Sequence, residues 1–196
     1  RYFNKGGIRL CSNRALELLV WKEVSIFSQI KSIKVMEIKV TNTKTLVGTD
    51  STIAKGESSD CMVYATAAAF DLDYDKAHQH VKHRFGRKDK KGTAMFSIIK
   101  GMQEMVDLRE NLNGKFVREI ISQPYKKYHL HGRDVNRKNR VSTFIKEHSQ
   151  GTYLILTSSH ALVSKDGEML DNNSVGSGKA FVNRAFKIEP VITFQP

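Results

Sequence analysis

Cysteine is scarce in this chain of 196 residues, which holds two, Cys11 and Cys61. Two cysteines cannot form a disulfide framework in a chain of this length, and they are typical of reduced thiols. A secreted protein that depends on disulfides is therefore excluded, and we expect the protein to work in a reducing compartment. Cys11 has no partner nearby in the sequence, and we expect it to be structural.

Long apolar runs are also missing. The stretch Leu18–Trp21 ends at Lys22 and Glu23, far short of the ~18 uncharged apolar residues that a membrane span requires. From the sequence we expect a soluble protein without a membrane partner.

Acidic residues are outnumbered. Lys and Arg total 32 against 20 Asp and Glu, which gives a formal net charge of +12. Basic clusters occupy residues 84–91, 126–127 and 133–140. Such a charge attracts polyanions, so a nucleic-acid partner is one interpretation and a solvated basic surface is the other. The basic clusters contain few aromatic residues, which gives little support to stacking on single strands.

The length fits one domain, preceded by an extension. Apolar residues recur at a mostly helical spacing over residues 15–33, which predicts a helix in an N-terminal helical extension, residues 1–35. The chain begins with Arg1, and Met36 is a candidate start of the domain proper, residues 36–196.

Within the domain, helical patterns come first and strand patterns follow. In the first half we expect a strand at 36–40, a polar flexible stretch at 41–58, and helices at 61–70, 74–83 and 94–106. Asp71 or Asp73 would cap the second of these helices, and Thr93 would cap the third. In the second half we expect a strand at 116–121, a basic loop, a short helix at 141–147, and strands at 153–157, 161–164, 168–170 and 185–194. This segregation indicates an α+β domain, with the last four strands forming an antiparallel sheet.

Cys61 stands at the start of a helical run of small residues, directly after the polar turn Ser58-Ser59-Asp60. The free N–H groups and the positive dipole end of a helix stabilise a thiolate there, so the pKa of Cys61 should fall. A buried, inert cysteine is the alternative interpretation.

A histidine and a carboxylate follow about a hundred residues later. His160 lies at a kink between two predicted strands, and Asp171 follows the Asp166-Gly167 turn, so the hairpin can bring Asp171 beside His160. Cysteine, histidine and carboxylate in this order fit a catalytic triad. The alternatives are an ordinary strand histidine and an aspartate that caps a turn.

A metal site is not expected. His80 and His83 share a helix face, but His78 points elsewhere, the more distant His129 and His131 complete no set, and no second cysteine pair is present. We also expect no cofactor.

Three blocks of this chain resemble the papain-like cysteine peptidase superfamily, and most closely the small papain-like proteins of bacteriophages and prophages. The blocks are Ser59–Ala65, Gly86–Thr93 and Gly151–Asp171. The resemblance covers roughly residues 45–175 and leaves residues 1–35 outside. Because all three blocks occur in order, they are more specific together than any single one.

The resemblance implies a helical half that carries Cys61, followed by an antiparallel sheet half that carries His160, with a cleft between them. Asp171 would orient the imidazole, and its neighbour Asn172 is the alternative for that role. Papain-like enzymes place a glutamine six positions before the nucleophile to hold the oxyanion, whereas this chain has Lys55 there. Losing a preorganised donor typically costs ~10²–10³ in rate.

These features favour a cysteine peptidase that acts on peptide or isopeptide bonds in a protein or peptide substrate. One alternative is a weakly active or inactive papain-fold protein that serves as a structural or accessory component of a phage virion and contacts other virion proteins. On either interpretation we expect the protein in the host cytoplasm or associated with the virion. A second alternative is acyl transfer of the transglutaminase type, which uses the same triad and would be revealed by incorporation of an amine.

Overall fold

The computed structural model describes residues 37–122, 125–130, 133–173 and 177–191. In the described part of residues 119–138, it describes the backbone but not the side chains. The chain divides into two units, Arg1–Glu37 and Ile38–Pro196, and all described helices and strands belong to the second unit. The helix predicted at 15–33 lies outside the described residues.

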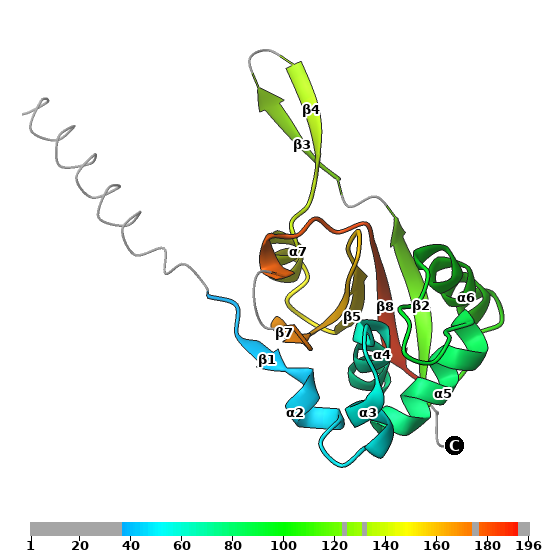
Figure 1. Cartoon of the computed structure of the whole chain (residues 1–196). Helices are drawn as coiled ribbons and strands as arrows, with labels where there is room; N and C mark the ends of the chain where they lie inside the picture. Colours follow the sequence, from blue (N-terminus) through cyan, green and yellow to red (C-terminus); the bar gives the residue numbers. More distant parts are fainter. Residues whose placement is uncertain (1–36, 123–124, 131–132, 174–176, 192–196) are drawn as a thin grey trace, which may run out of the picture. The chain divides into compact units, whose positions relative to one another are not determined.

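A six-stranded sheet in the order β1-β7-β6-β5-β8-β2 forms the centre of the second unit (Figure 1). Its strands are β1 (Val40–Asn42), β2 (Lys115–Ser122), β5 (Thr152–Leu156), β6 (Ala161–Lys165), β7 (Glu168–Asp171) and β8 (Arg184–Pro190). All neighbours pair antiparallel except β1 and β7, which are parallel. The α+β class is thus confirmed, and the four late strands predicted to form an antiparallel sheet do so as β5, β6, β7 and β8. The parallel strand is β1, which comes from the start of the domain and lies at the edge of the sheet beside β7.

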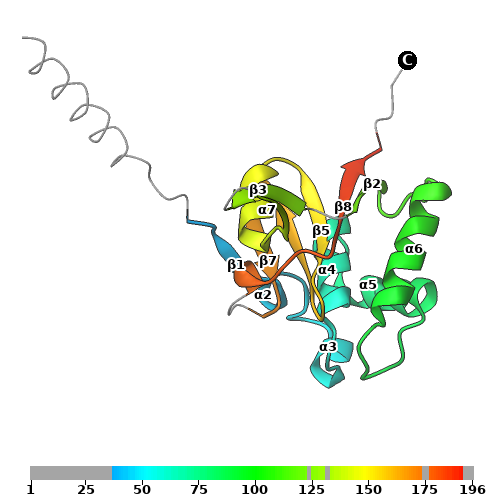
Figure 2. The same cartoon turned by 90° about the horizontal axis from the view of Figure 1, so that it is seen from above.

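Helices cover both faces of this sheet, as Figure 2 shows. The helices are α2 (Thr43–Val47), α3 (Thr52–Gly56), α4 (Cys61–Phe70), α5 (Tyr74–Phe85), α6 (Met95–Asp107) and α7 (Val141–Glu147). Successive strand residues point to opposite faces, so Leu154 joins the core under α4, α5 and α6 while Ile155 joins the core under α7. The alternating apolar strands therefore supply two hydrophobic cores.

Helix α4 is the central helix of the larger core. Every residue from Met62 to Phe70 is buried, and the helix contacts α2, α5, β5, β6 and β7. A helix that is apolar all round is stable only when it is enclosed on all sides, and the run of alanines lets its neighbours approach closely. The core therefore fixes the position of Cys61, the first residue of α4.

Helices α5 and α6 pack beside α4. The Asp73 side chain caps α5 by accepting the Lys76 N–H at 2.8 Å, which confirms one of the two predicted caps. Thr93 does not cap α6, because the N-cap residue is Ala94 and no side chain accepts a bond there. The predicted helix is confirmed, but its predicted cap is wrong by one position.

Two predicted loops are regular structure instead. Residues 41–58 contain α2 and α3, which are short helices capped by the side chains of Asn42 and Ser51. The expected basic loop contains β3 (Tyr125–Leu130) and β4 (Arg133–Lys138), which pair antiparallel as a separate two-stranded sheet. The charges in this segment obscured β-forming residues such as Tyr128 and Val135. Among the described residues, no helix has both the length and the apolarity needed to cross a membrane.

Candidate active site

Cys61 opens α4 and is partly exposed. The preceding residue, Asp60, does not cap the helix with its side chain, but its carbonyl accepts the N–H groups of Val63 and Tyr64 at 2.9 and 3.1 Å. The first turn of α4 is thus well formed, and the backbone N–H of Met62 in this turn donates to the Cys61 sulfur.

His160 immediately precedes β6 and is held by a short turn with Thr157. The Thr157 hydroxyl accepts the His160 N–H at 3.1 Å, and the Thr157 N–H donates to the His160 carbonyl at 2.9 Å. This turn closes the connection between β5 and β6. It fixes the backbone of His160 at one end of the sheet.

Asp171 is the last residue of β7 and is almost fully buried. Its Oδ1 atom accepts from His160 Nε2 at 2.6 Å and from the Asn173 N–H at 3.0 Å. Residues Val163 and Leu170 pair in the β6–β7 hairpin, which places the ends of the two strands side by side. The hairpin therefore brings the predicted carboxylate to the predicted base.

The imidazole of His160 also forms a hydrogen bond with the Cys61 thiol. Because Nε2 donates to Asp171, Nδ1 is the ring nitrogen that remains for Cys61. The structure thus joins Cys61, His160 and Asp171 in one series of hydrogen bonds.

Burial alone would raise the pKa of Cys61, since it penalises the thiolate. Hydrogen bonds from His160 and from the backbone at Ala161 and Met62, together with the charge of the imidazolium, outweigh burial and hold the pKa of Cys61 below its usual value. The helix start and the histidine therefore both favour the thiolate.

The hydrogen bond to Asp171, followed by the hydrogen bond to Cys61, raises the pKa of His160 to about 10, although burial acts in the opposite direction. Burial also raises the pKa of Asp171, but the bonds from His160, Ser177 and the Asn173 N–H bring it below its usual value. Asp171 and His160 are consequently charged at neutral pH, and both the helix start and the imidazolium favour the thiolate form of Cys61. A thiolate beside an imidazolium combines a nucleophile with a general acid.

Neither of the two supporting residues proposed from the sequence forms a hydrogen bond with Cys61 or His160 in the described part of the chain. Lys55 is exposed on α3. Asn172 does not bind His160; its Nδ2 atom lies 3.5 Å from Asp60 Oδ1. Asp60 is buried and also accepts from the Tyr74 hydroxyl at 2.7 Å. Asn172 and Tyr74 therefore contact the residue that precedes the nucleophile.

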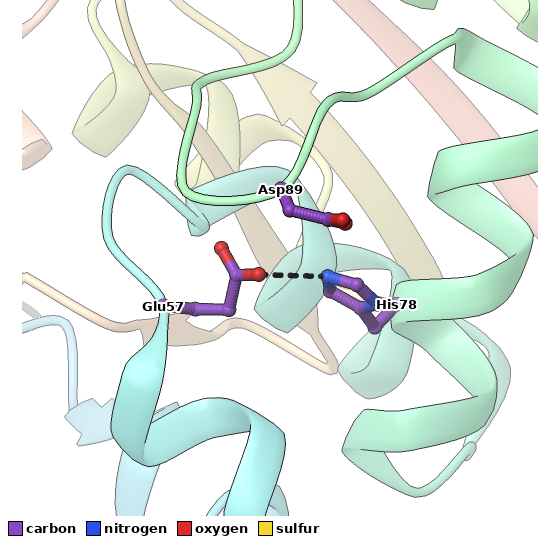
Figure 3. A group of neighbouring side chains, drawn as sticks. All are labelled: Glu57, His78 and Asp89. Atoms are coloured by element: carbon purple, nitrogen blue, oxygen red, sulfur yellow. Dashed lines mark hydrogen bonds and ion pairs between the residues drawn. The ribbon is translucent and has the colours of Figure 1, made fainter.

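A second polar cluster lies at the turn before Cys61, where Glu57, His78 and Asp89 converge (Figure 3). Glu57 Oε1 lies 3.2 Å from His78 Nε2. The guanidinium of Arg87 already occupies this space, because it lies 2.7 Å from Glu57 Oε2 and 2.9 Å from His78 Nε2. An internal cation thus takes the position that a metal ion would require, and the donor set does not fit a metal.

The other two histidines of α5 do not join the cluster. His83 is exposed. Burial, and to a smaller extent the charge of Arg84, lowers the pKa of His80 to about 4, and its ring lies edge-on to Phe85. His80 is thus a neutral, partly buried residue. Side chains at 129 and 131 lie outside the described ones.

Sequence reasoning missed Asp60, Tyr74, Glu57 and Arg87. Asp60 offered one signal, since an acidic residue directly before a nucleophile is unexpected unless its charge has partners. For Arg87, the only sequence signal was its position directly after Gly86, the left-handed residue that ends α5. The contacts of both residues depend on the tertiary fold.

No family model, no curated protein and no solved structure matches this chain. The resemblance to the papain-like superfamily therefore depends on the three sequence blocks alone.

Proposed function

We propose that the chain is a papain-like thiol hydrolase that cleaves peptide or isopeptide bonds. The observation that carries the proposal is the hydrogen-bonded series from Cys61 through His160 to the buried Asp171, at the N-terminus of a central helix. The pKa shifts favour the protonation state that each role requires. Asp171 is ionised, His160 is positively charged, and the pKa of Cys61 is lowered.

In acylation, Cys61 Sγ attacks the carbonyl carbon of the scissile amide, and the carbonyl oxygen takes the electron pair. The Cys61 N–H donates to this oxyanion. His160 gives its proton to the leaving nitrogen, the C–N bond breaks, and a thioester remains on Cys61. His160 then takes a proton from water, and the hydroxide attacks the thioester, which releases the acid and the thiolate. The charge of Asp171 stabilises the imidazolium throughout.

The first experiment measures the rate of iodoacetamide labelling of Cys61 against pH in the wild-type chain and in His160→Ala. We expect the wild type to label with an apparent pKa below the ordinary ~8.5, and the variant to lose this advantage. Mass spectrometry assigns the label to Cys61 rather than Cys11. A Cys11→Ala background removes the other thiol and is a matched control.

A second experiment measures hydrolysis on a fluorogenic peptide library, with and without an added primary amine, using Cys61→Ala as the blank. Cleavage that is lost in Cys61→Ala supports the proposed hydrolase activity. Amine incorporation in place of hydrolysis would instead assign acyl transfer. An ordinary thiol pKa together with no turnover would contradict both, and would favour the structural role in a phage particle.

A further inference from the structure

Arg87 follows α5 and is buried at the turn before the candidate nucleophile. Its side chain is 1% exposed. Nη2 donates to Glu57 Oε2 at 2.7 Å and to the Ser58 carbonyl at 3.2 Å, and Nη1 donates to His78 Nε2 at 2.9 Å. One guanidinium thus joins α5 to two successive residues of the turn.

The same turn holds a backbone conformation that is unfavourable for its sequence. Ser59, two residues before Cys61, has φ +55°. A non-glycine residue in this left-handed region costs roughly 1–2 kcal/mol relative to the right-handed form. The Ser59 side chain is exposed, so its own packing does not impose the conformation. The neighbouring residues must therefore hold it.

The loop that carries Arg87 supplies further bonds to the turn. The Lys90 N–H donates to Glu57 Oε2 at 2.8 Å, and the Ser58 hydroxyl donates to the Lys90 carbonyl at 3.2 Å. On the other side of Ser59, Tyr74 and Asn172 contact Asp60. The strained residue thus lies between two bonded segments, and Arg87 is the most buried group of the first.

We propose that Arg87 is a positioning residue for Cys61: it holds the Glu57–Ser59 turn in its left-handed conformation and so fixes where α4 begins. The inference rests on the proposed function, because it concerns the geometry between Cys61 and His160. Without the guanidinium, Glu57 and the Ser58 carbonyl lose their shared donor, and Ser59 can relax to an unstrained conformation. The first turn of α4 then shifts relative to His160.

A shift of this kind affects reactivity more than it affects folding. Nine buried residues of α4 lie beyond Cys61 and continue to hold the helix in the core. The Cys61–His160 hydrogen bond, in contrast, depends on the position of one side chain at the helix end. A displacement of about 1 Å can cost on the order of 10²-fold in rate.

The test compares Arg87→Lys and Arg87→Ala with Arg84→Ala, all with Cys11 replaced by alanine. Arg84 lies on α5 itself, three positions before Arg87, and its ion pairs are with Glu104 and Glu110 rather than with the turn, so its loss controls for a general weakening of α5. The pH dependence of Cys61 alkylation is measured for each variant at the same interval below its own melting temperature. Lysine keeps the positive charge but has one nitrogen instead of the two, Nη1 and Nη2, with which the guanidinium donates to its separate partners.

We expect both Arg87 variants to alkylate at neutral pH at least about tenfold more slowly than the wild type, with the apparent pKa of Cys61 moved upward. Arg84→Ala should stay within about twofold of the wild type. Added ethylguanidinium should restore part of the rate in Arg87→Ala, since the deletion leaves a buried site of matching shape and charge. Loss of packing alone would not produce this rescue.

Wild-type pH profiles in both Arg87 variants would overturn the positioning role and leave the proposed function intact. Equal rate losses in Arg84→Ala and Arg87→Ala without rescue would overturn it as well. An ordinary thiol pKa in the wild type would contradict the proposed function itself, and the positioning role would fall with it. If Arg87→Ala does not fold, Arg87→Lys alone decides between these outcomes.

Discussion

His160 Nε2 lies 2.6 Å from Asp171 Oδ1, and the two residues are 11 positions apart in the chain. The β6–β7 hairpin accounts for this contact, because it returns the chain to the end of the sheet at which β6 begins. The carboxylate side chain is fully buried and the imidazole is 20% exposed. A buried carboxylate that accepts from one ring nitrogen fixes the orientation of the ring and leaves the other nitrogen for the thiol.

Asp171→Asn should uncouple this pair. The hydrogen bond to Asp171 is the largest contribution that raises the pKa of His160 to about 10, so the variant should bring that pKa down toward the ordinary ~6.5. At neutral pH His160 then carries less charge, the thiolate of Cys61 loses its cation, and the labelling profile of Cys61 moves to higher pH. Titration of the His160 ring by NMR, together with alkylation rates against pH, measures both effects.

Glu168→Gln is the matched control for Asp171→Asn, because Glu168 is a carboxylate on the same strand that pairs with Lys39 and Thr41 rather than with His160. It should leave the pKa of His160 unchanged. An unaltered His160 titration in Asp171→Asn would show that the 2.6 Å contact does not control the imidazole.

Lys55→Ala tests the oxyanion role expected from the sequence. Lys55 is exposed on the short helix α3, and an exposed lysine is not preorganised around a developing charge. We therefore expect kcat/KM for peptide hydrolysis to fall by less than about tenfold, whereas loss of a fixed oxyanion donor typically costs ~10²–10³. A loss in the larger range would instead show that Lys55 donates to the oxyanion.

Local patterns were sufficient to predict much of the fold. Small residues after a polar turn predicted α4, Asp73 predicted the start of α5, and a turn flanked by two strand patterns predicted the β6–β7 hairpin. Each of these features depends on residues that are close in the sequence.

Distant contacts could not be predicted in the same way. Arg87 meets Glu57 across 30 positions, and Asn172 meets Asp60 across 112. The parallel pairing of β1 with β7 brings Val40, at the start of the domain, beside Met169. No periodicity in the sequence encodes these pairings, because they form only once the helices have packed on the sheet. The contacts of Arg87 and Asn172 beside the candidate nucleophile therefore became apparent only in the structure, whereas His160 and Asp171 were predicted from the sequence.

Tyr74→Phe should destabilise the protein through Asp60. The Tyr74 hydroxyl donates to Asp60 Oδ2 at 2.7 Å in a buried position, while the Asn172 contact to the other oxygen is longer, at 3.5 Å. Removing the hydroxyl leaves a buried carboxylate with one donor fewer, which costs about 1–3 kcal/mol. Urea unfolding measures the loss.

The control for Tyr74→Phe is Tyr64→Phe. The Tyr64 ring packs against that of Tyr74 at 4.9 Å between centroids, but its hydroxyl bonds to none of the described residues. We expect a change within about 0.5 kcal/mol for this variant. Equal losses in the two variants would show that the hydroxyl bond to Asp60 adds nothing beyond ring packing.

Gly101→Ala should also lower the free energy of unfolding, although alanine is the better helix former. A Cβ atom at this position of α6 would lie 2.4 Å from Phe85 Cδ1, and Phe85 is buried at the end of α5. Forcing the two helices apart costs about 1–3 kcal/mol, and the helix propensity of alanine offsets at most about 1 kcal/mol of this.

The control is Gly56→Ala, at the end of α3. An added Cβ atom there meets no atom within 4 Å, and the variant should change the stability by less than about 0.5 kcal/mol. Thermal and urea unfolding of the two variants compare the sites directly. A Gly101→Ala protein as stable as the wild type would contradict the close approach of α5 and α6, and with it the packing that carries Arg87 to the turn before Cys61.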